Sequence, residues 1–387
     1  MSHPILRVIF AASSLPHGGA ERHTIALTNR LAERGHECHA VSIKGHRGEL
    51  GRIRPGAGGS VSSLNAERHF DKRAVREFAA LISRIRPSAI VAANPYALMY
   101  SRLAMQVSGQ RPRLAVTFHT TLLQSAKEQL QMLFYRPFFW TADFLVFVCE
   151  RQKRHWLRRG VFARRNGVIH NGVDTDEFRD RWSPGERAGL RRALGFSAAD
   201  FVIGLSALLR PEKNHVQLVD AVAALRAQGV AARALMIGEG EMRAAIEARA
   251  RAVDVERSVV ITGFQSDVRP YIAACDVVAL CSLTETFSLA AIEAMALRRP
   301  VVHSDVGGAS EMIIPGHNGF LFRVGDTREL VHTLAILADP AVSRSMGDNA
   351  RELVERRFSE NTMVDRYERL LLQLCGAGAG ATPSPAV

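Results

Sequence analysis

Residues 6–11 read LRVIFA, an apolar run of strand length that decides how the chain begins. A glycine-containing turn, PHGG at 16–19, follows it, and a helical pattern of apolar residues covers 20–34. Strand, turn and helix in this order make a βα unit. Because the same alternation recurs along the chain, we expect parallel sheets with helices on both faces.

The alternation runs through one half of the chain and then restarts. In the first half we expect further strands at 39–43, 89–93, 114–118 and 144–149, with helices over 73–85 and 124–139. In the second half we expect strands at 201–205, 235–237, 259–262, 277–280 and 301–303, with helices over 214–228 and 241–252 and a helical stretch from 326 to 374. The sequence therefore predicts an α/β protein of two doubly wound, Rossmann-like domains that face a cleft.

These patterns place domain boundaries within a polar, glycine-bearing segment at 171–186. The expected domains are an N-terminal one at 1–178 that binds the acceptor and a C-terminal one at 179–361 that binds the donor. A helix at 362–375 can return to the first domain, and the Gly/Ala/Pro tail at 376–387 is expected to be disordered. Ligands of such sheets bind at the carboxyl ends of the strands.

Composition excludes several classes of protein. The chain has 387 residues, 47% apolar and 23% charged, which is typical of a globular protein. No apolar run is long enough for a membrane-spanning helix and no signal peptide is recognisable, so we expect a cytoplasmic protein. The five cysteines are widely spaced and none forms a C-x-x-C pair, which argues against a disulfide framework and a structural zinc site.

The charge is unevenly distributed. Residues 1–180 hold 27 Lys and Arg against 14 Asp and Glu, a net charge of +13, whereas the remainder carries −1. This asymmetry indicates a partner with phosphates, which could be an acidic substrate, an anionic membrane surface or a nucleic acid. The chain has only 3 Trp and 5 Tyr and no basic stretch interleaved with aromatic residues. Of the three possible partners, a nucleic acid is therefore the least supported.

The most specific motif is ETFSLAAIE at 285–293, which follows a strand and begins a helix. Ser288 is a natural N-cap, and the free N–H groups of the helix start can bind a diphosphate without a metal. Glu285 lies on the loop beside that anion. Glu293 lies ~7.5 Å further along the helix axis, about far enough to accept hydrogen bonds from a ribose.

This segment resembles the E-x7-E signature of the large family of retaining nucleotide-sugar glycosyltransferases with the two-Rossmann, GT-B architecture. Other segments are similar to family motifs in the same order, and together they cover most of residues 5–330: GGAER at 18–22, HNGVD at 170–174, LRPEKN at 209–214, GEG at 238–240, GF at 263–264 and GG at 307–308.

The resemblance implies a role for each matching residue. Glu285 and His119 are the catalytic candidates that face the donor sugar, and Glu293 holds the ribose. The candidates for the donor diphosphate are Arg210, Lys213, Gly18, Gly19, Phe287, Ser288 and Leu289. The nucleotide-base region is expected at Gly238, Glu239 and Gly263. The family often carries an arginine where this chain has Leu208, so either Arg210 takes over the phosphate contact or the donor is bound differently.

The same resemblance implies a UDP- or GDP-sugar donor, no metal and no further cofactor. It also implies a same-face mechanism in which the leaving phosphate accepts the acceptor's proton. Asp174-Thr175-Asp176 imitates a D-x-D metal site, but it lies near the linker and not at a strand end. A nucleotide-sugar epimerase of the same architecture and a nucleic-acid-binding protein remain alternative functions.

The sequence says less about the acceptor substrate than about the donor. The basic charge and the apolar segment 130–140 would suit a phosphate-bearing or lipid-linked acceptor, with peripheral association at the inner membrane face. Such an acceptor belongs to the assembly of cell-envelope polysaccharide, lipopolysaccharide or glycolipid. A core helix with solvated arginines explains the same segment equally well.

Overall fold

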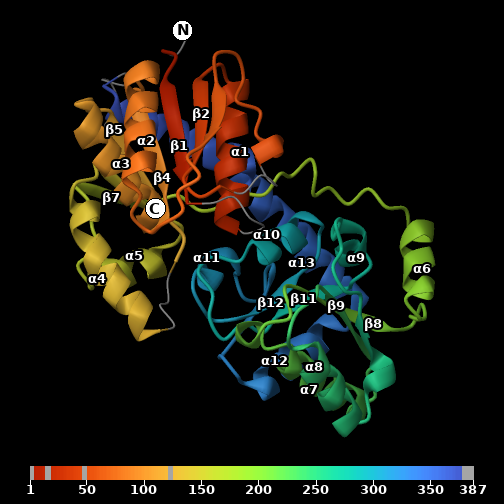
Figure 1. Cartoon of the computed structure of the whole chain (residues 1–387). Helices are drawn as coiled ribbons and strands as arrows, with labels where there is room; N and C mark the ends of the chain where they lie inside the picture. The colour runs from red at the N-terminus through yellow and green to blue at the C-terminus, as the bar shows by residue number, and fades with distance from the viewer. Residues whose placement is uncertain (1–3, 14–18, 46–49, 121–124, 377–387) are drawn as a thin grey trace. The chain divides into compact units, whose positions relative to one another are not determined.

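The computed structural model describes residues 4–13, 19–45, 50–120 and 125–376 (Figure 1). Gly18 and residues 377–387 of the expected disordered tail lie outside these ranges. The chain divides into two compact units. The first unit runs to Asn171 and includes the chain from Glu360 onward, and the second unit is Gly172–Ser359. The sequence placed the corresponding boundaries at 178 and 361.

The described part of the first unit contains a parallel sheet of seven strands in the order β3-β2-β1-β4-β5-β6-β7. Its strands are β1 (Arg7–Ala12), β2 (Glu37–Ser42), β3 (Ser60–Ser63), β4 (Ala89–Ala93), β5 (Arg113–Phe118), β6 (Phe144–Phe147) and β7 (Arg165–Val168). Its helices are α1 (Gly19–Glu33), α2 (Lys72–Ile85), α3 (Asn94–Ser108), α4 (Ala126–Trp140), α5 (Glu150–Leu157) and α14 (Glu360–Leu374), with a 3-10 turn at Leu50–Arg52. The two outermost strands, β3 and β7, were not predicted because SVSS and RNGV contain no apolar run.

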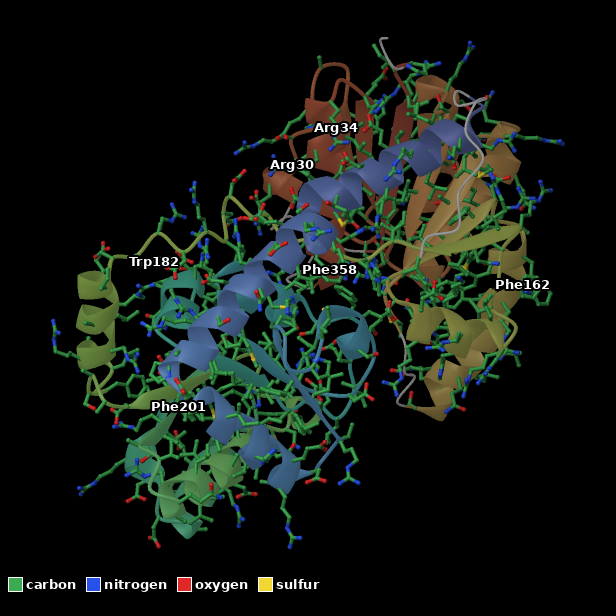
Figure 2. All side chains as sticks on the ribbon, turned by 180° about the vertical axis from the view of Figure 1, so that it is seen from behind. Arg30, Arg34, Phe162, Trp182, Phe201 and Phe358 are labelled. Carbon is green, nitrogen blue, oxygen red and sulfur yellow. The ribbon has the colours of Figure 1, made fainter. Side chains whose placement is uncertain are left out.

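Helix α14 belongs to the first unit because of its packing on α1 and the sheet. Tyr367 and Leu371 are buried in a core cluster with Phe10 of β1. Arg30 Nε lies 2.5 Å from Glu360 Oε1, and Arg34 Nη1 lies 2.5 Å from Glu368 Oε2. Figure 2 shows Arg30 and Arg34 beside this last helix. Apolar burial and two ion pairs therefore hold the C-terminal helix against the first sheet.

The second unit contains a parallel sheet of six strands, in the order β10-β9-β8-β11-β12-β13. Every one of its residues is described. The strands are β8 (Phe201–Ser206), β9 (Ala232–Ile237), β10 (Val259–Ile261), β11 (Val277–Leu280), β12 (Val301–Ser304) and β13 (Gly319–Phe322). The helices are α6 (Pro184–Ala193), α7 (His215–Ala227), α8 (Arg243–Ala252), α9 (Arg269–Ala273), α10 (Leu289–Ala296), α11 (Ala309–Met312), α12 (Thr327–Leu337) and α13 (Pro340–Leu353). Short 3-10 turns lie at Pro211–Lys213 and Glu256–Ser258, and a π-helical turn lies at Val354–Phe358.

Two expectations for this part of the chain need correction. The helical stretch predicted from 326 is interrupted, because Pro340 begins α13 and Asp339 accepts the N–H of Ala341 as its cap. The expected linker at 171–186 is partly fixed inside the second unit, where Asp180 Oδ2 lies 2.8 Å from Arg187 and 2.7 Å from Arg299. Helix α6 then begins behind a capping box formed by Ser183 and Glu186.

The two doubly wound parallel sheets predicted from the sequence are confirmed. In the second sheet the strand order reverses between β8 and β11, and in the first sheet it reverses between β1 and β4. At such a point the loops after the two strands diverge to opposite faces of the sheet and leave room for a ligand at the carboxyl ends. The loops after β8 and β11 are therefore where the second unit can bind one.

Candidate functional site

The loops after β8 and β11 bring Lys213 and Glu285 together. Lys213 ends the 3-10 turn Pro211–Lys213, and its Nζ lies 2.5 Å from Glu285 Oε2. The two side chains are 26% and 19% exposed, so the ion pair is partly shielded from water. The N–H of Leu283 donates to the carbonyl of Glu212 at 2.8 Å and joins the two loops through the backbone.

The start of α10 is held in place beside this pair. Ser288 is its N-cap, and its Oγ accepts the N–H of Ala291 at 3.3 Å, as the motif predicted. Phe287 is buried and its ring lies 5.7 Å from that of Phe358. Leu289 is the first helical residue. Backbone N–H groups of this turn are thus presented next to Glu285, in the arrangement that suits an anion.

Gly307 allows the loop after β12 to support the loop after β11. Its φ is +54°, and a Cβ there would collide with the carbonyl oxygens of Glu285 and Thr286. The N–H of Gly308 donates to the carbonyl of Thr286 at 2.8 Å. Glycine at this position therefore permits the backbone contact that positions Glu285.

The glycines in the segment expected to lie near the nucleotide base also allow close backbone contacts between loops. Gly238 and Gly240 have φ values of +149° and +155°, and a Cβ on either would strike a carbonyl of the loop after β8, at Ala207 or Leu209. Gly238 also forms a bridge with Gly263, whereas Glu239 is exposed. The loops after β8, β9 and β10 consequently lie in contact along one edge of the sheet.

Two further predicted site residues, Glu293 and Arg210, differ in burial and in their contacts. Glu293 lies on α10 and is buried, so its carboxylate is restricted before any ligand arrives. Arg210 is 58% exposed and its nearest carboxylate is Glu212, at 3.9 Å. The structure does not bring Arg210 to the Lys213–Glu285 pair, and Leu208 is 46% exposed.

In the first unit, His119 follows β5 and lies in a group of buried aromatic residues. Its backbone N–H donates to Asn94 Oδ1 at 3.2 Å, and its ring lies 4.8 Å from that of His23, on α1. The ring of His23 lies 5.2 Å from that of Tyr367, on α14. His23 was missed by sequence reasoning, although it lies one turn after Gly19, which begins α1.

These buried groups lack hydrogen-bond partners among the described residues: His119 Nε2, both ring nitrogens of His23 and the Tyr367 hydroxyl. Burial lowers the pKa of His119 to about 4 and holds the pKa of His23 well below its usual range, with the neighbouring His119 adding to the effect on His23. Both rings are therefore neutral at pH 7.

The second unit also contains two buried histidines near Lys213 that the sequence did not single out. His215 begins α7, and its burial, with the nearby Lys213, lowers its pKa to about 4. His303 lies on β12, and its burial lowers its pKa. Its Nδ1 lies 2.7 Å from the carbonyl oxygen of Ser304, which can only accept, so Nδ1 carries the proton and the unpartnered Nε2 is an acceptor.

Within the described ranges, no three His, Cys, Asp or Glu residues are grouped so as to hold a metal ion. In the Asp174-Thr175-Asp176 segment, Asp174 Oδ1 instead accepts the N–H groups of Asp176 and Glu177, both at 2.9 Å, and closes a local turn. None of the helices in the described part of the chain is long and apolar enough to cross a membrane.

Comparison with known proteins gives two family matches. Residues 186–353 match the family described as Glycosyl transferases group 1, and residues 17–177 match Glycosyltransferase Family 4. A putative glycosyltransferase EpsD of Bacillus subtilis strain 168 is 30% identical over 60% of this chain and 62% of its own length. The UDP-Gal:alpha-D-GlcNAc-diphosphoundecaprenol alpha-1,3-galactosyltransferase of Escherichia coli is 23% identical over 70% of this chain and 72% of its own length.

A solved structure has the same fold. The crystal structure of Anabaena Alr3699/HepE in complex with UDP-glucose superposes with a TM-score of 0.81 at 23% sequence identity, and covers 95% of this chain and 100% of that one.

Proposed function

Because the chain belongs to the group 1 and family 4 glycosyltransferases, which are retaining enzymes of GT-B fold, we propose that it transfers a sugar from a uridine diphosphate donor to a phosphate-bearing or lipid-linked acceptor. The observation that carries this proposal is the Lys213–Glu285 pair at the sheet's switch point, beside the start of α10. Family membership favours glycosyl transfer over the epimerase and nucleic-acid alternatives.

The donor diphosphate is proposed to bind Lys213 and the backbone N–H groups at 287–289, with the exposed Arg210 as a further contact from the loop that carries Lys213. Lys213 supplies a point charge and the helix start supplies oriented donors, so the anion is compensated without a metal ion. Glu285 neutralises Lys213 through their ion pair. A bound diphosphate competes for that lysine and leaves the Glu285 carboxylate available to the donor sugar.

The nucleoside is proposed to extend along the same edge of the sheet. Glu293 accepts the ribose hydroxyls, and the chain at Gly238, Glu239 and Gly263 lies against the base. Uracil is preferred over guanine because the E. coli relative is named for UDP-Gal and the Anabaena structure contains UDP-glucose.

The reaction is proposed to retain the configuration of the anomeric carbon through same-face attack. The bond from the anomeric carbon to the diphosphate breaks, the acceptor oxygen forms the new bond, and the leaving phosphate takes the acceptor's proton. Glu285 contacts the donor sugar in this scheme. In the first unit, the neutral imidazole of His119 can hydrogen-bond a sugar hydroxyl without adding a positive charge.

The acceptor is proposed to carry a phosphate or a diphosphate on a lipid. The supporting observations are the net charge of +13 over residues 1–180 and the lipid diphosphate in the name of the E. coli relative. We accordingly place the enzyme in the assembly of cell-envelope polysaccharide, lipopolysaccharide or glycolipid, in the cytoplasm or peripherally on the inner face of the membrane.

Thermal unfolding in the presence of UDP, GDP and other nucleoside diphosphates tests the donor proposal. At ~100 times its dissociation constant the correct nucleotide adds ~2.7 kcal/mol to the free energy of unfolding, and chelating divalent ions should not remove the effect. Lys213→Ala should reduce this stabilisation to ~1.4 kcal/mol or less at the same nucleotide concentration, whereas Lys72→Ala, in the other unit, should preserve it. A shift that requires a divalent ion, or no shift with any nucleotide, would contradict the proposed site.

A further inference from the structure

Helix α4 has an apolar face that points into solvent. The exposed large side chains on it are Leu130, Leu133, Phe134 and Trp140, and Phe162 lies next to Trp140. These five side chains are between 43% and 69% exposed. Figure 1 shows α4 at the periphery of the first unit.

The spacing of these residues defines one continuous stripe. Positions 130, 133, 134, 137 and 140 recur every three to four residues, so they share one side of a helix. Met132, Tyr135 and Phe139 occupy the opposite side and are buried in the core of the first unit. Burial of Met132, Tyr135 and Phe139 therefore stabilises the folded unit. The exposed stripe contributes little to that stability, so its apolar character needs another explanation.

Trp140 extends the stripe to a neighbouring loop. Its ring stacks on that of Phe162 at 5.7 Å with an interplanar angle of 25°, and its Nε1 donates to the carbonyl of Gly160 at 3.0 Å. Figure 2 shows Phe162 at the outer edge of the unit. The apolar surface is thus fixed by a ring stack and a hydrogen bond at one end of α4.

Cations lie at the Trp140 end of this surface. Residues 125–165 contain nine Lys and Arg against three Asp and Glu, a net charge of +6. Arg158 and Arg159 directly precede Gly160, and Arg164 follows Phe162 by two residues; all three side chains are exposed. The apolar stripe is consequently bordered by positive charge on the loop that its tryptophan contacts.

We propose that this face of α4, together with Phe162, docks on the surface of an anionic lipid bilayer. Leucine and phenylalanine enter the boundary between headgroups and acyl chains, and tryptophan is the side chain best suited to that depth. Arginines at the border contact lipid phosphates. A bilayer fits better than a protein partner because it demands a convex apolar stripe and positive charge but no shape complementarity.

The docking does not depend on the proposed donor reaction, although it would place the enzyme beside a lipid-linked acceptor. Sedimentation of the full chain with anionic phosphatidylglycerol vesicles and neutral phosphatidylcholine vesicles, across a salt series, measures it directly. Wild-type protein should bind the anionic vesicles at low salt and progressively less as salt rises, because exposed charges are screened beyond ~10 Å at 0.1 M.

Two pairs of variants separate the apolar and the charged contributions. Leu130→Ser with Phe134→Ser should reduce partitioning at least about tenfold, since two large apolar side chains no longer insert. The matched control is Phe70→Ser with Val107→Ser, two residues of the same unit that are 48% and 60% exposed but lie outside α4. Arg158→Glu with Arg159→Glu should reduce partitioning at least about 25-fold, against no comparable loss for Arg76→Glu with Arg84→Glu on α2.

The UDP-induced thermal shift should be unchanged in all four double variants, which shows that each is folded and separates this inference from the donor proposal. Absence of vesicle binding by the wild type overturns the docking, as does equal binding by the α4 variant. A wild-type dimer in light scattering that the α4 variant converts to a monomer would assign the face to a second copy of the chain instead.

Discussion

Lys213 Nζ lies 2.5 Å from Glu285 Oε2, so the two side chains proposed to receive adjacent groups of the donor, its diphosphate and its sugar, neutralise one another. The pair joins loops 72 residues apart in the sequence. A diphosphate that binds Lys213 must displace the Glu285 carboxylate, so the two anions compete for the lysine. Binding of the nucleotide and release of Glu285 are therefore one event.

Glu285→Gln should increase the affinity for free UDP about three- to tenfold, because the diphosphate no longer competes with a carboxylate for Lys213. Lys213→Met should weaken UDP at least tenfold, because the charge-assisted contact is lost. Isothermal titration calorimetry with UDP measures both. Weaker UDP binding in Glu285→Gln would mean that the carboxylate supports the nucleotide and does not compete with it.

Substitutions of Glu293 and Glu285 should change different kinetic parameters when the complete nucleotide-sugar donor is the substrate. Glu293→Ala should raise the KM for the donor about tenfold with little change in kcat, because a ribose contact is the same in the ground state and the transition state. Glu285→Ala should lower kcat about 100-fold, because the donor sugar changes during the reaction. Glu239→Ala, an exposed neighbour of the site, should change KM less than Glu293→Ala. A lower kcat in Glu293→Ala together with a higher KM in Glu285→Ala would contradict the proposed orientation of the nucleotide.

The buried histidines should make the protein acid-labile. His119 and His215 have folded-state pKa values of about 4, against about 6.5 when unfolded. Between those values the unfolded chain binds a proton that the folded chain does not, so stability falls as pH falls. The loss is about 1.4 kcal/mol per pH unit for each histidine.

Urea unfolding between pH 7.5 and 4.5 checks this slope. His215→Gln should reduce the slope for the second unit by the share of one histidine, whereas His332→Gln, which removes an exposed ring of the same unit, should leave it unchanged. Equal slopes in all three proteins would show that His215 titrates normally in the folded state.

Gly307→Ala should disturb the loop that carries Glu285. Its φ of +54° disfavours a side chain, and the added Cβ would meet the carbonyl of Glu285, so the loops must separate. We expect a loss of about 1–3 kcal/mol in the free energy of unfolding and weaker UDP binding. Gly316→Ala, with φ of +78° but open space around it, should cost only backbone strain and leave UDP binding intact. Similar UDP affinity in the two variants would argue against the supporting role of Gly307.

The sequence by itself determined the two wound sheets, because buried parallel strands require continuous apolar runs that are visible in one dimension. The strands at 89–93 and 277–280 were predicted to the residue, and so was the cap at Ser288. Edge strands β3 and β7 were missed because one side of such a strand is free of neighbours and tolerates polar residues. The proposed ligand contacts of the site residues stay predictions.

Only the tertiary structure decided which distant side chains meet and which face of α4 is outside. The contact of His23 with Tyr367 joins the two ends of the first unit, and no local pattern encodes a partner 344 residues away. The segment 130–140 is apolar around much of its circumference, so hydrophobic periodicity could not assign an inner side. Packing assigned it by burying Met132, Tyr135 and Phe139, and the apolar residues left over define the exposed stripe.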